Sequence, residues 1–217
     1  MKKTICLHYC QAKNFGDALN PILIERLTGC ECVYAGRYSA DIIGIGSILN
    51  RFTRPYFCGQ IRNLLSRPAV VWSSGFIKEE DNPLKFRKNI SFAAVRGKLS
   101  KQCVEKSVGR SVDVALGDGG LLFGCLLDKK PEKKYAIGFT PHCADFDNPI
   151  FKQLCDTVPN SKLINFSDDP LQVLEQIAQC EFILSTAMHG LIAADSLGIP
   201  NKWLKLSVLK GNEFKYN

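Results

Sequence analysis

The stretch ILSTAMHGLIAADSLGIPNKWL, residues 183–204, decides the fold class of this chain. An apolar run typical of a strand ends at Ser185, a loop of small residues carries His189 and Gly190, and a helix-like segment follows up to Pro200. A strand that leads through a short loop into a helix is the repeating unit of parallel α/β folds. Since such folds bind ligands at the carboxyl ends of their strands, His189 stands at a position suited to chemistry.

The same alternation of short apolar strands and helix-like segments runs through the whole chain and predicts an α/β fold with parallel sheets. A first set of strands is expected at 4–9, 32–35, 41–46, 69–74, 90–95 and 112–116. A second set is expected at 135–139, 162–166 and 182–185, with a last strand after Pro200.

Charge, proline and a loss of apolar periodicity coincide in DKKPEKK, so we expect a linker at about 128–133. It would join two Rossmann-like domains, residues 1–128 and 133–217. Because a complete Rossmann-like half has about five or six strands, we expect the second domain to be incomplete and further residues to follow Asn217.

Two helix starts carry local signals. Asn20 before Pro21 predicts a helix that begins with PILIERL, because asparagine is a good N-cap and proline suits the first helical position. The segment Ser167 to Pro170 predicts another start in the same way.

Composition sets the class of protein. The chain has 217 residues, of which 46% are hydrophobic, enough for a buried core. No run approaches the roughly 18 apolar residues of a membrane span, and MKKTICLHYCQAKNFGD lacks the features of a signal peptide. We therefore expect a cytoplasmic protein without a transmembrane segment.

The net charge is +7, from 28 Lys and Arg against 21 Asp and Glu. This excess favours an anionic ligand or peripheral association with the inner face of an anionic membrane. The charges are dispersed and lack interleaved aromatic residues, so we expect no nucleic-acid partner. The dense basic run KKPEKK is interpreted as a solvated linker.

Ten cysteines are spread along the chain without a Cys-x-x-Cys pair. We interpret them as reduced and mostly buried small apolar residues rather than as a disulfide framework. Cys30 with Cys32, or Cys6 with Cys10, would bind zinc only with ligands from elsewhere, so no metal site is expected.

Four stretches have the form strand, loop and helix, and we expect them to converge on one cleft. They are NFGDALNP (14–21), GIGSIL (44–49), ALGDGGLL (115–122) and STAMHGLIAAD (185–195). Gly44 and Gly46 are expected to allow a tight turn or close packing. Asp17 and Asp118 either cap helices or contact a ligand, and the residue types leave both open.

The three histidines differ in the roles that their positions predict. His189 can exchange a proton near neutral pH, and Gly190 at the helix start can receive a phosphate or carboxylate; the alternative is a histidine that only packs. His142 ends the first strand of the second set in a similar way, with the same two interpretations. His8 lies inside the first strand and is expected to be structural.

Arg96 follows a strand and precedes Gly97 and a helix that carries Lys98. A planar guanidinium at the mouth of a loop suits a bidentate grip on a carboxylate or phosphate. The alternative is a surface ion pair.

These motifs carry a resemblance over almost the full chain. NFGDALNP, GIGSIL, SFAAVRGKLS, ALGDGGLL, GFTPH and STAMHGLIAADSLGIP, in this order, resemble the polysaccharide pyruvyl transferase family, whose members attach pyruvate as a ketal to sugars of exopolysaccharides and cell-wall polymers. The most specific elements are NFGD and HGLIAADSLGIP.

The resemblance implies two Rossmann-like domains in a GT-B-like arrangement, with the active site between them. It also implies phosphoenolpyruvate as donor, no further cofactor, and a saccharide acceptor, which can be lipid-linked. The chain departs from the family pattern at two places. An arginine is expected two residues before the histidine, where this chain has Ala187, and a Gly-Asp-Pro-Ala pattern is replaced by GDGG from Gly117.

Under this resemblance, His189 is the candidate acid-base residue and Asp17 is placed to meet acceptor hydroxyls. Arg96, Lys98, His142 and the helix start at Gly190 are candidates for the anion site. The same loops add the candidate substrate contacts Asn14, Gly16, Ser185 and Asp118. Two other functions stay open: a GT-B glycosyltransferase that uses a nucleotide sugar, and an inactive protein that binds sugars or anions.

Overall fold

The computed structural model describes residues 3–12, 14–54, 66–79, 85–86, 88–206 and 214–216. The chain divides into two compact units. Unit 1 comprises Met1–Cys10, Asn20–Gly119 and Leu209–Asn217, and unit 2 comprises Gln11–Leu19 and Gly120–Val208. Each unit has its own parallel sheet, so the α/β class is confirmed.

The domain limits 1–128 and 133–217 remain a prediction. In the division into compact units, the chain passes from unit 1 to unit 2 at Gly119 and Gly120, and the predicted linker lies within unit 2. Most of KKPEKK is exposed, as a solvated segment requires, although Lys133 donates to the backbone oxygens of Ala178 and Cys180 at 3.0 and 2.6 Å.

The sheet of unit 1 has the strand order β2-β1-β3-β5-β7-β8, with every pair parallel. Its strands are β1 (Thr4–His8), β2 (Glu31–Tyr34), β3 (Ile42–Ile43), β5 (Ala69–Ser74), β7 (Ile90–Val95) and β8 (Ala115–Leu116). A short antiparallel pair, β4 (Thr53–Arg54) and β6 (Lys85–Phe86), was not predicted from the sequence, because two-residue strands leave no periodic pattern.

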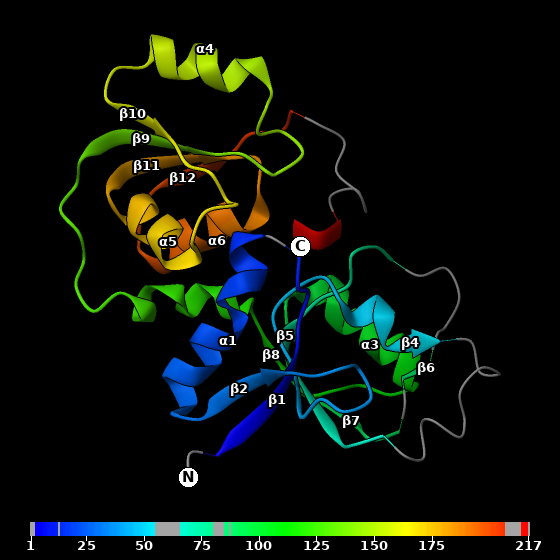
Figure 1. Ribbon diagram of the computed structural model, residues 1–217. Coiled ribbons are helices and arrows are strands. Elements are labelled where there is room, and N and C mark those ends of the chain that lie inside the picture. Colours follow the sequence, from blue (N-terminus) through cyan, green and yellow to red (C-terminus); the bar gives the residue numbers. More distant parts are fainter. Residues whose placement is uncertain are drawn as a thin grey trace. The chain divides into compact units, whose positions relative to one another are not determined.

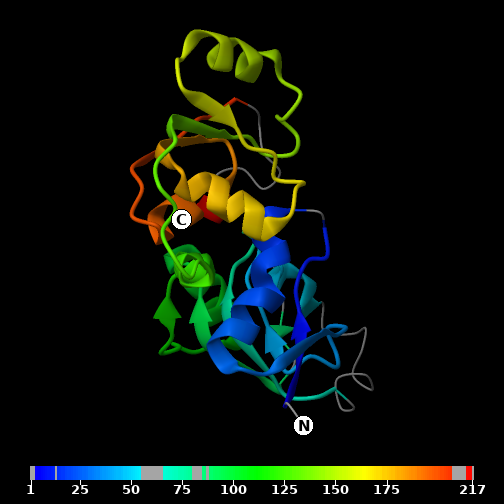
Figure 2. The same ribbon diagram turned by 60° about the vertical axis from the view of Figure 1, so that its left-hand side comes forward.

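In the sheet of unit 1, β2 lies on one side of β1, and the later strands follow one another on the other side. Right-handed crossovers in opposite directions place their helices on opposite faces of the sheet. Accordingly, α1 (Phe15–Thr28), after β1, and α3 (Lys98–Val108), after β7, lie on opposite faces (Figures 1 and 2). The strand order reverses between β1 and β3, and this is the topological switch point at which such sheets bind ligands.

The sheet of unit 2 has the order β10-β9-β11-β12, again parallel throughout. Its strands are β9 (Tyr135–Thr140), β10 (Ser161–Leu163), β11 (Cys180–Ser185) and β12 (Asn201–Trp203). Figures 1 and 2 show α4 (Pro149–Thr157) on one face, and α5 (Pro170–Ala178) and α6 (Met188–Ser196) on the other. The switch point of this sheet therefore lies between β9 and β11.

The predicted helix starts had different outcomes. Asp169 accepts hydrogen bonds from the backbone of Leu171 and Gln172 and caps α5, within the predicted segment. The prediction for Asn20 is wrong, because α1 already begins at Phe15. Instead of capping, the Asn20 side chain accepts from the Ile45 N–H at 2.7 Å and donates to its oxygen at 3.2 Å, a tertiary contact that local rules do not reveal.

The close approach of Asn20 also explains Gly44, since a Cβ there would overlap the Asn20 amide. The packing interpretation of Gly44 is thus confirmed. Gly46 has φ +133, a backbone conformation that side chains disfavour, which agrees with a turn.

The cysteines that the structure describes are all free, but among them only Cys103 and Cys180 are buried, so the expectation of mostly buried cysteines is wrong. Burial raises the pKa of Cys180 to about 11, which keeps its thiol protonated. Cys58 lies outside the described residues. In the described ranges, no helix is long and apolar enough to cross a membrane, and no group of three or more His, Cys, Asp or Glu could hold a metal ion.

Candidate active site

The switch point of unit 2 carries the motif that contains His189. Strands β9 and β11 end side by side, with Thr140 and Ser185 paired in register. The chain leaves β11 through Thr186 and Ala187 and enters α6, in which His189 is the second residue. The structure therefore places His189 where the sequence predicts it, after a parallel strand and at the start of a helix.

Ser185 and Gly190 shape this turn. The Ser185 hydroxyl is fully buried; its Oγ lies 2.9 and 2.7 Å from the backbone oxygens of Thr140 and Ala187, which compete for its one proton, and it accepts from the Ala187 N–H at 3.0 Å. The Gly190 N–H donates to the Ala187 oxygen at 3.1 Å, and a Cβ on Gly190 would overlap the Ser185 hydroxyl. Both residues thus hold α6 against the strand ends, and their predicted contact with substrate remains a prediction.

His189 is held by packing. Its side chain is buried, and its Nε2 atom has no hydrogen-bond partner within the described ranges. Its ring lies 6.4 Å from that of Phe123, which in turn packs on Phe15 at 5.8 Å, and Phe15 packs on Phe166 at 4.9 Å. One ring of this aromatic row thus packs on His189 and leaves its Nε2 without a hydrogen bond to the described residues.

Gly16 connects two of the predicted motifs, because a Cβ on Gly16 would overlap the His189 ring. The glycine of NFGD is therefore the surface on which the histidine of STAMHG rests. Beside it, Asn14 is the residue just before α1, and its backbone oxygen accepts a hydrogen bond from the Ala18 N–H at 2.9 Å. The Asn14 amide donates to Asp17 Oδ2 at 3.2 Å, and the carboxylate of Asp17 lies in the first helical turn, where it is electrostatically favoured.

The hydrogen bonds of His142 define which ring nitrogen carries the proton when the ring is neutral. Its Nδ1 accepts a hydrogen bond from the Ala144 N–H at 3.2 Å, which places the proton of the neutral ring on Nε2. Its own backbone N–H donates to Thr186 Oγ1 at 2.8 Å, so the loop after β9 is fastened to the loop after β11. The side chain is half-buried.

Two further polar residues near this edge were missed by the sequence analysis. The Thr140 hydroxyl and Asp145 Oδ2 are buried, and neither has a hydrogen-bond partner in the part of the chain that the structure describes. Asp145 donates its N–H to the His142 oxygen at 2.7 Å, which fixes its place in the same loop. The available signal was its position within five residues of the end of a strand.

Arg96 lies in unit 1, where β7 ends. Its Nε lies 3.6 Å from Asp118 Oδ2, and both side chains are 5% exposed. Its Nη1 donates to Ser47 Oγ at 2.9 Å and to the Lys215 oxygen at 3.4 Å. Arg96 therefore does form an ion pair, as the alternative interpretation expected. The pair is buried, however, so the expectation of a surface position is wrong. Lys98, the first residue of α3, is exposed.

The four glycine-containing loops contact one another in three places. NFGDALNP meets STAMHGLIAAD in unit 2 through Gly16 and His189. In unit 1 it meets GIGSIL through Asn20 and Ile45, and GIGSIL meets ALGDGGLL through Ser47, Arg96 and Asp118. A single cleft for all four remains a prediction.

Comparison with known proteins places the chain in a family. The chain is 28% identical over 213 residues to the succinoglycan biosynthesis protein ExoV of Rhizobium meliloti, with 95% of this chain and 60% of that protein covered. It is 26% identical over 215 residues to an uncharacterized protein of Acanthamoeba polyphaga mimivirus, with 96% and 70% covered. The model of the polysaccharide pyruvyl transferase family matches residues 3–204, nearly the whole chain, and the chain belongs to this family.

Proposed function

We propose that this protein transfers pyruvate from phosphoenolpyruvate to a saccharide precursor of an exopolysaccharide or cell-surface glycan, as a ketal. Family membership and a relative named for succinoglycan biosynthesis support transfer to a polysaccharide. The observation that carries the proposal is His189, a buried imidazole at the switch point of unit 2 with an unengaged Nε2.

The reaction requires one acid and one base. A proton adds to the methylene carbon of phosphoenolpyruvate, and a sugar hydroxyl adds to the neighbouring carbon. A second hydroxyl of the same sugar then forms the second C–O bond as the C–O bond to phosphate breaks. Of the two hydroxyl protons, one is matched by the proton that the methyl group gains and the other leaves on hydrogen phosphate. The scheme therefore consumes no oxidant or reductant.

His189 is assigned the proton transfer to the methylene carbon. Imidazole gives and takes protons near neutral pH, and a positioned acid-base group contributes about 10²–10⁴-fold to rate. Phe123 and Gly16 pack on the ring without using Nε2, which leaves that nitrogen for a proton transfer in this proposal. Asp17, with Asn14 beside it, is assigned to the acceptor hydroxyls.

The family pattern has an arginine where this chain has Ala187, and Ala187 is buried at the N-cap of α6. Other residues must therefore bind the anionic groups of the donor. We assign this role in unit 2 to His142, whose neutral ring carries its proton on Nε2. Arg96 and Lys98 stay candidates in unit 1, although Asp118 already offsets the charge of Arg96. A GT-B-like arrangement of the two units is part of the proposal.

The test is product analysis. Purified protein is incubated with phosphoenolpyruvate labelled with ¹³C in the pyruvyl group and with lipid-linked and free saccharides. Mass spectrometry should find the label in the saccharide and an equal amount of released phosphate. Release of phosphate without labelled saccharide would contradict the proposal, and so would label transfer from a nucleotide sugar alone.

A further inference from the structure

The switch point of unit 1 contains a second buried histidine, which the proposed chemistry does not use. His8 is the last residue of β1, beside the position where the strand order reverses. Its Nδ1 donates to the Ala35 oxygen at 2.8 Å, since a carbonyl can only accept, and its Nε2 has no partner among the described residues. In parallel α/β sheets this position is the expected place for a ligand.

Two arginines lie beside it. Arg37 is half-buried in the loop after β2, and Arg51 is exposed at the end of η1 (Leu49–Arg51). Arg37 Nη1 donates to the Arg51 oxygen at 3.2 Å, and Arg51 Nη2 lies 3.7 Å from Cys10 Sγ. Over the described ranges, neither guanidinium is paired with a carboxylate, and the Arg37 guanidinium lies over the Tyr38 ring, 4.9 Å from its centroid.

The field of these cations reaches the switch point. Burial lowers the pKa of His8, and the positive charges of Arg51 and Arg37 lower it further, while the hydrogen bond to Ala35 acts in the opposite direction. Both guanidiniums reach the surface, and two planar forks suit the oxygens of a phosphate.

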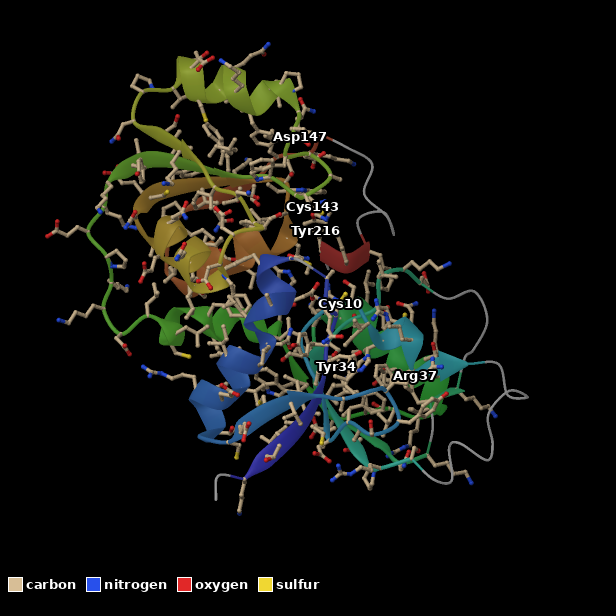
Figure 3. The ribbon with its side chains drawn as sticks, viewed as in Figure 1. Cys10, Tyr34, Arg37, Cys143, Asp147 and Tyr216 are labelled. Atoms are coloured by element: carbon tan, nitrogen blue, oxygen red, sulfur yellow. The ribbon has the colours of Figure 1, made fainter. Side chains whose placement is uncertain are left out.

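An exposed tyrosine precedes Arg37 in the same segment of the chain. Tyr34, at the end of β2, is 46% exposed, and its ring lies 5.8 Å from His8 and 5.6 Å from Tyr9. Figure 3 labels Tyr34, Arg37 and Cys10, which come from β2, from the loop after it and from the segment after β1. An exposed ring on a fixed support offers an apolar face to the C–H groups of a sugar.

We propose that Arg37, Arg51 and Tyr34 form a subsite that binds the phosphate of a phosphorylated or carrier-linked saccharide, with the sugar next to it on Tyr34. The identity of the ligand as the acceptor rests on the proposed function, whereas phosphate binding rests on unit 1 alone. A carrier-linked acceptor has a diphosphate, which matches two cations better than the single carboxylate of an acidic sugar.

Binding is tested without turnover, by calorimetric titration of the full chain with inorganic pyrophosphate. Arg37→Ala and Arg51→Ala should each weaken binding by about 10- to 100-fold, as expected for a charged hydrogen bond. The matched control is Arg110→Ala, which removes an exposed arginine of the same unit and should change binding less than about twofold. Equal affinity in all four proteins would overturn the subsite.

Kinetics then identify the ligand. With a diphosphate-linked saccharide, Arg37→Ala should raise the KM for the acceptor and leave the KM for phosphoenolpyruvate and kcat unchanged, and with the same saccharide lacking phosphate it should have no effect. If phosphoenolpyruvate binding instead depends on Arg37 and Arg51, the subsite belongs to the donor and our assignment is wrong. Pyrophosphate binding that depends on these arginines, in a protein without transferase activity, would refute the proposed function and keep the subsite.

Discussion

The two switch points are alike in their histidine and differ in the residues around it. Each has a buried histidine with an unengaged Nε2, His189 in unit 2 and His8 in unit 1. Around His189, the neighbours include the Phe123 ring and Gly16. Around His8, the rings of Phe52 and Tyr34 lie 5.1 and 5.8 Å away, and the positive charges of Arg51 and Arg37 act on it as well. Position at a strand end therefore does not by itself define a role, because the two histidines have different neighbours.

A third strand end sharpens this comparison, because there the cation is compensated. Arg96 and Asp118 form a buried pair at the ends of β7 and β8. Arg96→Ala leaves Asp118 as a buried charge and should lower the free energy of unfolding by about 3–5 kcal/mol. Chemical denaturation measures this, with Arg110→Ala as the control, because Arg110 is an exposed arginine of the same unit and its loss should change stability by less than about 0.5 kcal/mol.

If Arg96→Ala is as stable as the wild type, the pair does not support the fold. The arginine would then be available for the donor, and a loss of phosphoenolpyruvate affinity in the same variant would show it.

The packing at the unit 2 switch point can be broken through Gly16. A Cβ in Gly16→Ala would overlap the His189 ring, so the histidine or α1 must shift. Overpacking of this kind should cost about 1–3 kcal/mol of stability, and turnover should fall further because the acid is displaced. The matched control is Gly36→Ala, where the nearest atom to a Cβ would be 3.7 Å away, and stability and turnover should both be kept.

The smallest expected effect concerns His8. Because its pKa is lowered in the folded state, the unfolded chain takes up the proton first as the pH falls. Neutral His8 therefore contributes fully to the free energy of unfolding above the usual imidazole pKa of about 6.5. This contribution is lost as the pH falls from there through the lowered pKa of the folded state. His8→Gln should flatten the decrease in melting temperature in this acidic range. An unchanged slope would mean that the arginines and burial do not act on His8.

The strands and their parallel class were predictable, because short apolar runs and the loops between them leave a periodic record in the sequence. So was the place of His189, since it depends on one strand, one loop and one helix. The start of α1 was not, because Asn20 and Pro21 are a good local start signal that the contact between Asn20 and Ile45 overrides.

The site was predictable only in part, for a similar reason. NFGD and STAMHG are more than 150 residues apart, and only the fold shows that Gly16 rests on His189. The burial of Arg96 depends on Asp118 and Ser47, which come from two other loops. Arg37 and Arg51 belong to no sequence motif. Only the structure shows that, within its described residues, neither of them pairs with a carboxylate.

The most direct test of the account is the transfer of the ¹³C-labelled pyruvyl group from phosphoenolpyruvate to a saccharide by wild-type protein and by His189→Gln. The wild type should form the labelled ketal, and His189→Gln should keep its melting temperature and phosphoenolpyruvate affinity while turnover falls by about 10²–10⁴-fold. Near wild-type turnover in His189→Gln would show that the histidine in STAMHG serves packing alone, and the mechanism proposed for this protein would be wrong.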